Sequence, residues 1–277
     1  VEKKANLVVA HHPIIFGGLK KINGKNYVEK AVIAAIKNDI AIYAIHTNLD
    51  NVSSGVNGRM AALLGLTNTS VLLPKENTLK KLFTSVPVND AEKVRTAIFG
   101  AGGGHIGNYS EASFNTAGVG TFKAGEGAKP AVGESGKRHE EPEIKIEIIF
   151  PSFAEQPVIA ALKKAHPYEE VAYDLVPLSN QHQGIGSGLL GHLPGAMEEK
   201  AFLEKIRSVF QVPVIRHSAF VNRPVKRVAL CGGAGSFLIS KALASGADAY
   251  ITADIKYHEF FDANGKLLVC DVGHYES

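Results

Sequence analysis

The feature that most constrains the fold is a short apolar strand pattern that recurs along the chain and is followed by polar residues. Residues 7–10 and 40–45 form two such apolar runs, and residues 29–39 between them carry apolar side chains at helical spacing. A strand, a helix and a strand in this order favour a parallel sheet with a right-handed crossover. Ligands of such sheets collect beyond the carboxyl ends of the strands. We therefore expect the polar residues after both strands to lie on one rim.

Histidines and an aspartate occupy this expected rim. His11 and His12 directly follow the first strand, where Pro13 breaks the extended pattern, and His46 and Asp50 follow the second strand. Imidazole is the commonest neutral metal ligand, and a carboxylate supplies an oxygen donor beside it. The grouping favours a metal site. The alternatives are that these polar side chains only end the strands, that Asp50 satisfies turn amides, and that His46 orients a ligand or contacts substrate.

Two later segments repeat the pattern near the end of the chain. Asp254 and His258 follow an apolar run at 249–252 and stand four residues apart, which places them on one face if the segment is helical. That spacing suits a metal pair or a hydrogen-bonded acid and base pair. By spacing alone, Asp254 as a helix N-cap beside an exposed His258 is the slightly favoured alternative. His274 follows the last apolar run, at 267–270.

The middle of the chain has a different texture and predicts an inserted ferredoxin-like module. Eleven of the 28 glycines fall between residues 100 and 136, which predicts long loops with turns there. The segment at 166–170 joins a helix to a strand and is expected to have a structural role. The module is expected to contain strands at 81–88, 143–150 and 171–176 and helices at 90–99 and 153–165.

Composition excludes several classes of protein. The 30 basic and 27 acidic residues leave a net charge of +3 without a long basic block, so nucleic acid is not the expected partner. No apolar run approaches the roughly 20 residues that span a bilayer, and no signal peptide is evident, which predicts a cytoplasmic protein. Cys231 and Cys270 stand far apart and are expected to be buried thiols. The glycine-rich segment at 231–236 is expected to be a tight turn, with weak anion binding as the alternative.

Four segments together carry a family resemblance: residues 10–13, 46–50, 252–258 and 273–277. Their order and context resemble the GTP cyclohydrolase I type 2 family, the NGG-interacting-factor-like proteins. The middle region, from about residue 104 to 170, resembles the PII-like or CutA-like module of the longer bacterial members. The resemblance covers essentially the whole chain.

The resemblance implies a two-lobed α/β metal-binding fold with an inserted ferredoxin-like (PII/CutA-like) α+β module. The expected domains are residues 1–78 as a first lobe truncated at its N-terminus, 79–178 as the insert, and 179–277 as a second lobe truncated at its C-terminus. It also implies a toroidal homohexamer around dinuclear metal centres.

The resemblance further implies a set of site residues. The family's last metal ligand is a Glu four residues after the position of His274, which lies past Ser277 and is not matched by Glu276. Two divalent ions, Zn, Mn or Fe, are implied in each subunit. The matched metal ligands are His11, His12, Asp50 and His274, and the matched pocket residues, with proton-transfer, orienting or substrate-contact roles, are His46, Asp254 and His258.

These observations favour a hydrolase in which two divalent ions activate water and act on a small molecule. The family name implies opening of the purine ring of GTP with release of formate. The main alternative is a non-catalytic, metal-binding regulatory protein whose insert binds a small ligand or a partner. A nucleic-acid-binding factor ranks last, because it would require a basic face.

Overall fold

A computed structural model describes residues 2–277 of the chain and resolves them into two compact units. Unit 1 combines the chain up to Leu73 with Gly184–Ser277, and unit 2 is Pro74–Gln183. The structure places the boundaries of unit 2 five residues outside the expected insert, 79–178, at each end. None of the helices among residues 2–277 combines the length and hydropathy that a membrane crossing requires.

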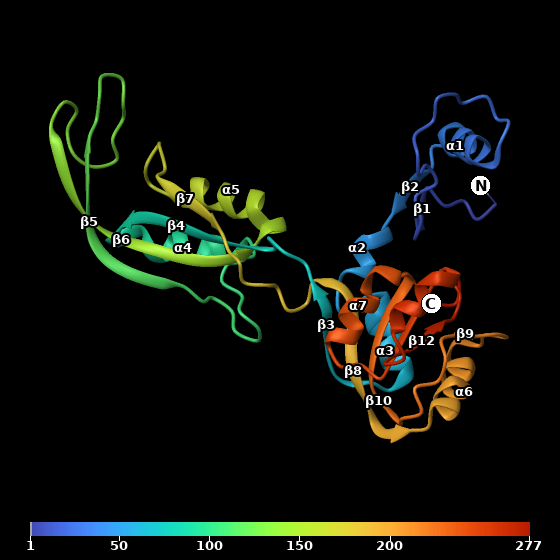
Figure 1. The fold of residues 1–277 in the computed structure, drawn as a ribbon. Helices are drawn as coiled ribbons and strands as arrows, with labels where there is room; N and C mark the ends of the chain where they lie inside the picture. Colours follow the sequence, from blue (N-terminus) through green and yellow to red (C-terminus); the bar gives the residue numbers. More distant parts are fainter. Residues whose placement is uncertain (1) are drawn as a thin grey trace. The chain divides into compact units, whose positions relative to one another are not determined.

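Unit 1 contains two sheets and their covering helices (Figure 1). Its strands are β1 (Leu7–Ala10), β2 (Ala41–Ala44), β3 (Thr67–Pro74), β8 (Gly186–Met197), β9 (Arg216–His217), β10 (Val225–Ala234), β11 (Ala249–Ala253) and β12 (Leu268–Asp271). Its α-helices are α1 (Tyr27–Lys37), α2 (His46–Asp50), α3 (Val56–Leu64), α6 (Glu199–Phe210) and α7 (Ile239–Ala244), and its 3-10 helices are η3 (Ser236–Leu238) and η4 (Tyr257–Ala263).

The small sheet confirms the expected strand, helix and strand unit, because β1 and β2 pair in parallel. Helix α1 between them starts where the Asn26 side chain accepts a hydrogen bond from the Glu29 amide at 2.9 Å. The Glu29 carboxylate in turn accepts hydrogen bonds from the Lys25 amide at 2.9 Å and from the Asn26 side chain at 2.9 Å. Helix α3 ends at Gly65, whose φ of 71° is left-handed and suits glycine.

The large sheet is mixed, in the order β3-β8-β10-β11-β12-β9. Strands β10, β11 and β12 run parallel, while β8 runs antiparallel to β10 and β9 runs antiparallel to β12. Alternate strand residues face opposite sides, so that Ile251 and Tyr250 of β11 belong to different apolar clusters. Residues of α3 and α6 join one cluster, and those of α7 join the other. Burial on both faces makes this sheet the core of unit 1.

Unit 2 has the β-α-β-β-α-β order of a ferredoxin-like fold, with strand order β5-β6-β4-β7. Helices α4 and α5 contribute to a single apolar cluster with one face of this sheet. The elements are β4 (Leu79–Pro87), η1 (Val88–Asp90), α4 (Ala91–Gly100), β5 (Phe114–Lys123), β6 (Arg138–Pro151), η2 (Ser152–Ala154), α5 (Glu155–Ala165) and β7 (Tyr173–Pro177).

Several expectations were wrong because local composition did not report long-range pairing. Strand β5 crosses the glycine-rich region that we expected to form only loops, since β6 pairs with all ten of its residues. The sequence patterns predicted no strand at the positions of β3 and β8. Strand β10 continues through residues 231–234, where we expected a turn, with a register shift between Leu230 and Ala234. Cys231 and Cys270 are free and buried as expected.

Candidate metal centre

The backbone of the small sheet places two of the predicted histidines side by side. The Ile45 amide donates to the Ala10 carbonyl at 3.0 Å, and the His46 amide donates to the His11 carbonyl at 2.8 Å. The parallel pairing thus extends past both strand ends and into the predicted site. His46 begins α2 with a φ of 32°, a left-handed conformation that is uncommon for residues other than glycine.

The side chains after β1 and β2 converge. The rings of His11 and His12 lie 4.7 Å apart between centroids, and that of His46 lies 5.7 Å from His11 and 5.3 Å from His12. His11 Nε2 lies 3.8 Å from Asp50 Oδ1. Asp50 ends helix α2, which begins at His46, so the helix returns Asp50 toward the strand ends.

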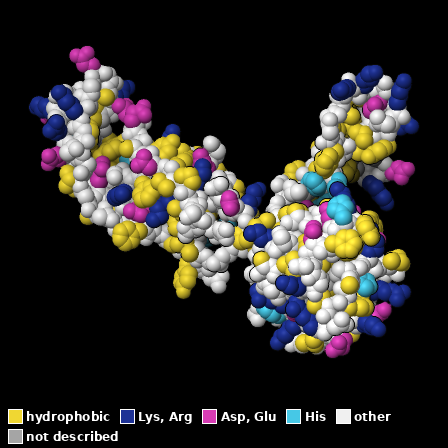
Figure 2. Space-filling model, in the orientation of Figure 1, with side chains coloured by type: hydrophobic (Ala, Val, Ile, Leu, Met, Phe, Trp, Pro, Cys, Tyr) yellow, Lys and Arg dark blue, Asp and Glu magenta, His cyan; other side chains and the backbone are white. Residues whose placement is uncertain are grey.

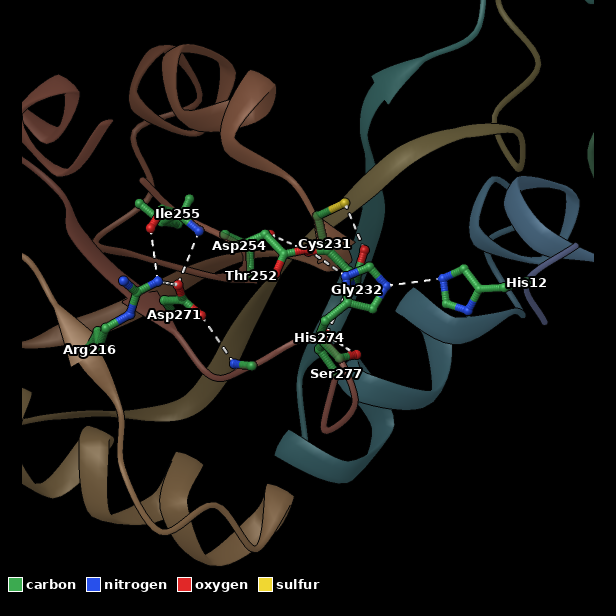
Figure 3. Close-up of polar contacts among 12 residues, drawn as sticks. His12, Arg216, Cys231, Gly232, Thr252, Asp254, Ile255, Asp271, His274 and Ser277 are labelled. Carbon is green, nitrogen blue, oxygen red and sulfur yellow. Dashed lines mark hydrogen bonds and ion pairs between the residues drawn. The ribbon is translucent and has the colours of Figure 1, made fainter. Parts of the chain in front are cut away.

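His274 reaches the same cluster from the other end of the chain (Figure 3). Its Nε2 lies 3.2 Å from His12 Nε2, and its Nδ1 lies 2.5 Å from Asp254 Oδ2. Asp254 follows β11 with a left-handed φ of 58°. A carboxylate that accepts the Nδ1 proton leaves the lone pair on Nε2, which is the arrangement that prepares an imidazole to bind a metal ion. Asp254 therefore acts in this structure as an orienting residue for His274.

Asp271, which sequence analysis missed, holds the two loops that carry Asp254 and His274. Its Oδ2 accepts a hydrogen bond from the Ile255 amide at 3.0 Å, and its Oδ1 accepts one from the Gly273 amide at 3.1 Å. Its carboxylate is buried and pairs with Arg216. The signal in the sequence was an acidic residue directly after the apolar run at 267–270, similar to Asp50, which follows the run at 40–45 a few residues later.

Asn57 is a second positioning residue that sequence analysis missed. Its Nδ2 donates to the Asp50 carbonyl at 2.7 Å, and its Oδ1 accepts from the Gly232 amide at 2.9 Å. Buried on α3, Asn57 thereby ties the α2 backbone to β10. Gly233, the residue after Gly232, lies beside the His274 ring and has a left-handed φ of 65°, a backbone conformation that suits glycine.

His258 lies apart from this cluster. It is exposed on η4, and no hydrogen bond, ion pair or ring contact joins it to the other six predicted site residues within 2–277. The expected helical face shared with Asp254 does not form, because Asp254 stands before η4 in a left-handed conformation. The other six residues gather at one place on the surface of unit 1, where histidines appear cyan in Figure 2.

The donor atoms suit divalent cations of intermediate hardness. Two nitrogens bound to a tetrahedral zinc ion at about 2.0–2.1 Å lie about 3.4 Å apart, close to the 3.2 Å between the Nε2 atoms of His12 and His274. His11 and Asp50 form a second pair of donors at 3.8 Å. Within residues 2–277, no group of three or more His, Cys, Asp or Glu side chains is assembled around a common cation position. The described side chains therefore offer two separate pairs of donors, each smaller than the three or four protein ligands of a typical zinc site.

Electrostatics favours the neutral, metal-binding form of His12. The pKa of His12 is lowered from its ordinary value, first by desolvation and then by the neighbouring imidazoles of His11, His274 and His46, while Asp50 opposes the shift. A lowered pKa keeps the ring unprotonated at neutral pH, and only the unprotonated nitrogen donates a lone pair to a cation.

The fold and the site define a class: an α/β protein with histidines and carboxylates converging at the carboxyl ends of parallel strands. The whole chain, residues 1–277, matches the Duf34/NIF3 (NGG1p interacting factor 3) family. The chain belongs to this family.

Relatives in sequence and structure agree with this assignment. Proteins named "GTP cyclohydrolase 1 type 2 homolog" from Halalkalibacterium halodurans and Bacillus subtilis are each 42% identical to it, over 99% of this chain and 74% of theirs. A Bacillus cereus protein related to NIF3 has a similar structure, with a TM-score of 0.84 at 42% identity, over 99% of this chain and 74% of that one.

Proposed function

We propose that unit 1 is a hydrolase that depends on two divalent cations. The observation that carries the proposal is the convergence of two donor pairs, His11 with Asp50 and His12 with His274, from distant parts of the chain. We assign one cation to each pair, with Zn, Mn or Fe as candidates because imidazole and carboxylate suit all three. When bound, such cations would supply Lewis acidity toward water and substrate.

The chain's own residues would orient the ligands and move protons. Asp254 holds the His274 ring through its 2.5 Å contact with Nδ1. His46 lies beside His11 and His12 without an ion-pair partner among the described residues, so we assign it proton transfer to or from the reacting molecule. Exposed His258 on η4 is assigned to contact with the substrate beyond the donor pairs.

The names of the relatives make GTP the first substrate to test, with hydrolytic opening of the purine ring and release of formate as the reaction. We further propose that unit 2 is a PII/CutA-like module, a proposal supported by its ferredoxin-like strand order, and that the protein assembles as a homohexamer. The second candidate function is non-catalytic metal binding with a regulatory role for unit 2, supported by the separate cavity described below.

The test combines metal content with turnover. Full-length protein is loaded with Zn, Mn or Fe, its metal content is measured by plasma mass spectrometry, and formate release from GTP is followed. The His11→Ala/His12→Ala double variant should lose both metal and turnover, because it removes one nitrogen from each donor pair. The control, His105→Ala, removes an exposed imidazole from unit 2 and should change neither.

The outcomes separate the candidates. Metal that depends on His11 and His12, without turnover of GTP or of simple phosphodiesters, would favour the regulatory function. Equal metal content in the double variant and the His105→Ala control would contradict both candidate functions, because both require metal bound by these histidines.

A further inference from the structure

Unit 2 contains a cavity that has no part in the proposed metal chemistry. Its volume is about 400 Å³, which lies within the range of small-molecule sites. The end of β5, the loop after it, and the segment before β7 form its walls, and all of these belong to unit 2. Apolar groups of Phe122, Ala128, Pro130 and Ala131 line much of it.

A buried carboxylate gives this cavity its chemical character. Glu143 on β6 is only 8% exposed and lines the cavity. Its Oε1 accepts a hydrogen bond from the Tyr168 hydroxyl at 2.8 Å. No Lys, Arg or His within residues 2–277 forms an ion pair with it, and no hydrogen bond from these residues reaches its Oε2. Because Glu143 lines the cavity and no cation among the described residues pairs with its carboxylate, the second oxygen is available to a cation that enters the cavity.

The surrounding structure preserves this oxygen's position. A Cβ atom built on Gly120 would approach Glu143 Oε2 to 2.3 Å, so the absence of a side chain there gives the carboxylate its space. The pKa of Tyr168 is raised well above its ordinary value by desolvation and by the Glu143 carboxylate, which keeps the hydroxyl protonated as a donor.

His166 anchors the segment at 166–170, for which we expected a structural role. The buried His166 ring accepts from the Tyr168 amide at 3.1 Å through Nδ1, so its Nε2 donates to the Ser85 carbonyl at 3.0 Å. This anchoring presents Tyr168 and Glu169 to the cavity. The lining then carries Glu143, Glu169 and Glu170 against a single cation, Lys123, which leaves two net negative charges.

We propose that this cavity binds a small organic cation: an ammonium group on an apolar or aromatic body of about one ring. The ammonium would meet Glu143 Oε2, and the apolar body would lie against Phe122 and the loop residues, where an aromatic face also favours a cation. The inference goes beyond the proposed function, because unit 2 contains none of the metal-centre residues.

The experiment uses three probes of nearly the same shape and different charge: 2-phenylethylammonium, 2-phenylethanol and phenylacetate. Their binding to the full metal-free chain is measured by calorimetry. The cation should bind, and the alcohol and the anion should bind at least about tenfold more weakly, because only the ammonium satisfies the buried carboxylate. Equal binding of cation and alcohol, or no binding of the cation at millimolar concentration, would overturn the proposal.

Two variants locate the site. Glu143→Gln keeps the shape of the side chain and removes its charge, so it should weaken binding of the cation about tenfold or more. The matched control, Glu140→Gln, removes an exposed carboxylate from the same strand and should leave binding unchanged. Ala131→Leu, at an exposed position that lines the cavity, reduces the space for the ligand and keeps the Glu143 carboxylate. It should also abolish binding, and it tests the site independently if Glu143→Gln does not fold. Binding that survives both variants would sink the proposal.

Discussion

At the scale of single residues, the candidate centre depends on side chains that orient other side chains. Asp254 and His46 both adopt left-handed backbone conformations, which residues other than glycine seldom adopt. Such conformations persist where the surrounding structure imposes them and often mark functional sites. At Asp254 the result is visible, because the unusual backbone directs the carboxylate to His274 Nδ1.

Replacement of Asp254 by Asn should weaken metal binding about 10- to 100-fold, the usual effect of losing a carboxylate behind a ligating imidazole. The ring of His274 would remain, but its tautomer and orientation would no longer be fixed by a charge. Competition with a chromophoric chelator measures the affinity. His258→Ala is the comparison, because the structure places His258 outside the cluster, and equal affinities of the two variants would contradict the orienting role.

At the scale of elements, the strand ends are held to one another by buried polar groups. Asp271 at the end of β12 receives amide hydrogen bonds from residues beside Asp254 and His274, and its register partner across the sheet is Arg216 of β9. A single carboxylate therefore sets the positions of two loops. Removal of the Asp271 carboxylate would leave the two loop amides and the Arg216 guanidinium without this acceptor.

Asp271→Ala should lower the free energy of unfolding of unit 1 by about 2–4 kcal/mol and also weaken metal binding. The stability change follows from the lost hydrogen bonds, and the affinity change from the displaced loops. Urea unfolding and chelator competition measure the two effects. Asp262→Ala removes an exposed carboxylate from η4 and should produce neither; wild-type metal affinity in a folded Asp271→Ala protein would argue against the positioning role.

At the scale of the whole molecule, the two units separate the proposed metal chemistry from the proposed cation cavity. Every residue of the candidate metal centre lies in unit 1, and every cavity residue lies in unit 2. The segments that flank unit 2 are joined within unit 1, because β3 and β8 are neighbours in its sheet. Removal of unit 2 thus leaves both sheets of unit 1 complete.

A chain in which residues 74–183 are replaced by a short Gly/Ser linker should keep the metal affinity of the full chain within a few-fold. The donors His11, His12, Asp50 and His274 and the positioning residues Asp254, Asp271 and Asn57 all remain. Chelator competition on both chains gives the comparison, with circular dichroism to verify folding. A folded but metal-free shortened chain would show that unit 2 contributes to the centre.

The sequence by itself determined the local elements and most of the candidate residues. Helical spacing located α1 and α5, and the polar residues that follow apolar runs located the histidines, because both signals depend only on neighbours in the chain. The same signals missed β5 and β8, whose glycine-rich segments become strands only by pairing with β6 and β10. Local composition cannot report a partner that is far away in sequence.

Only the tertiary structure decided which candidates meet. His12 and His274 are separated by 262 residues, and the order of the strands in space brings them within 3.2 Å. The same folding leaves His258 outside the cluster and adds Asp271 and Asn57, whose roles arise from contacts with the backbone of distant loops. The physical reason is that the type of side chain sets what chemistry is available, while the sheet order and the loops after each strand set which side chains share it.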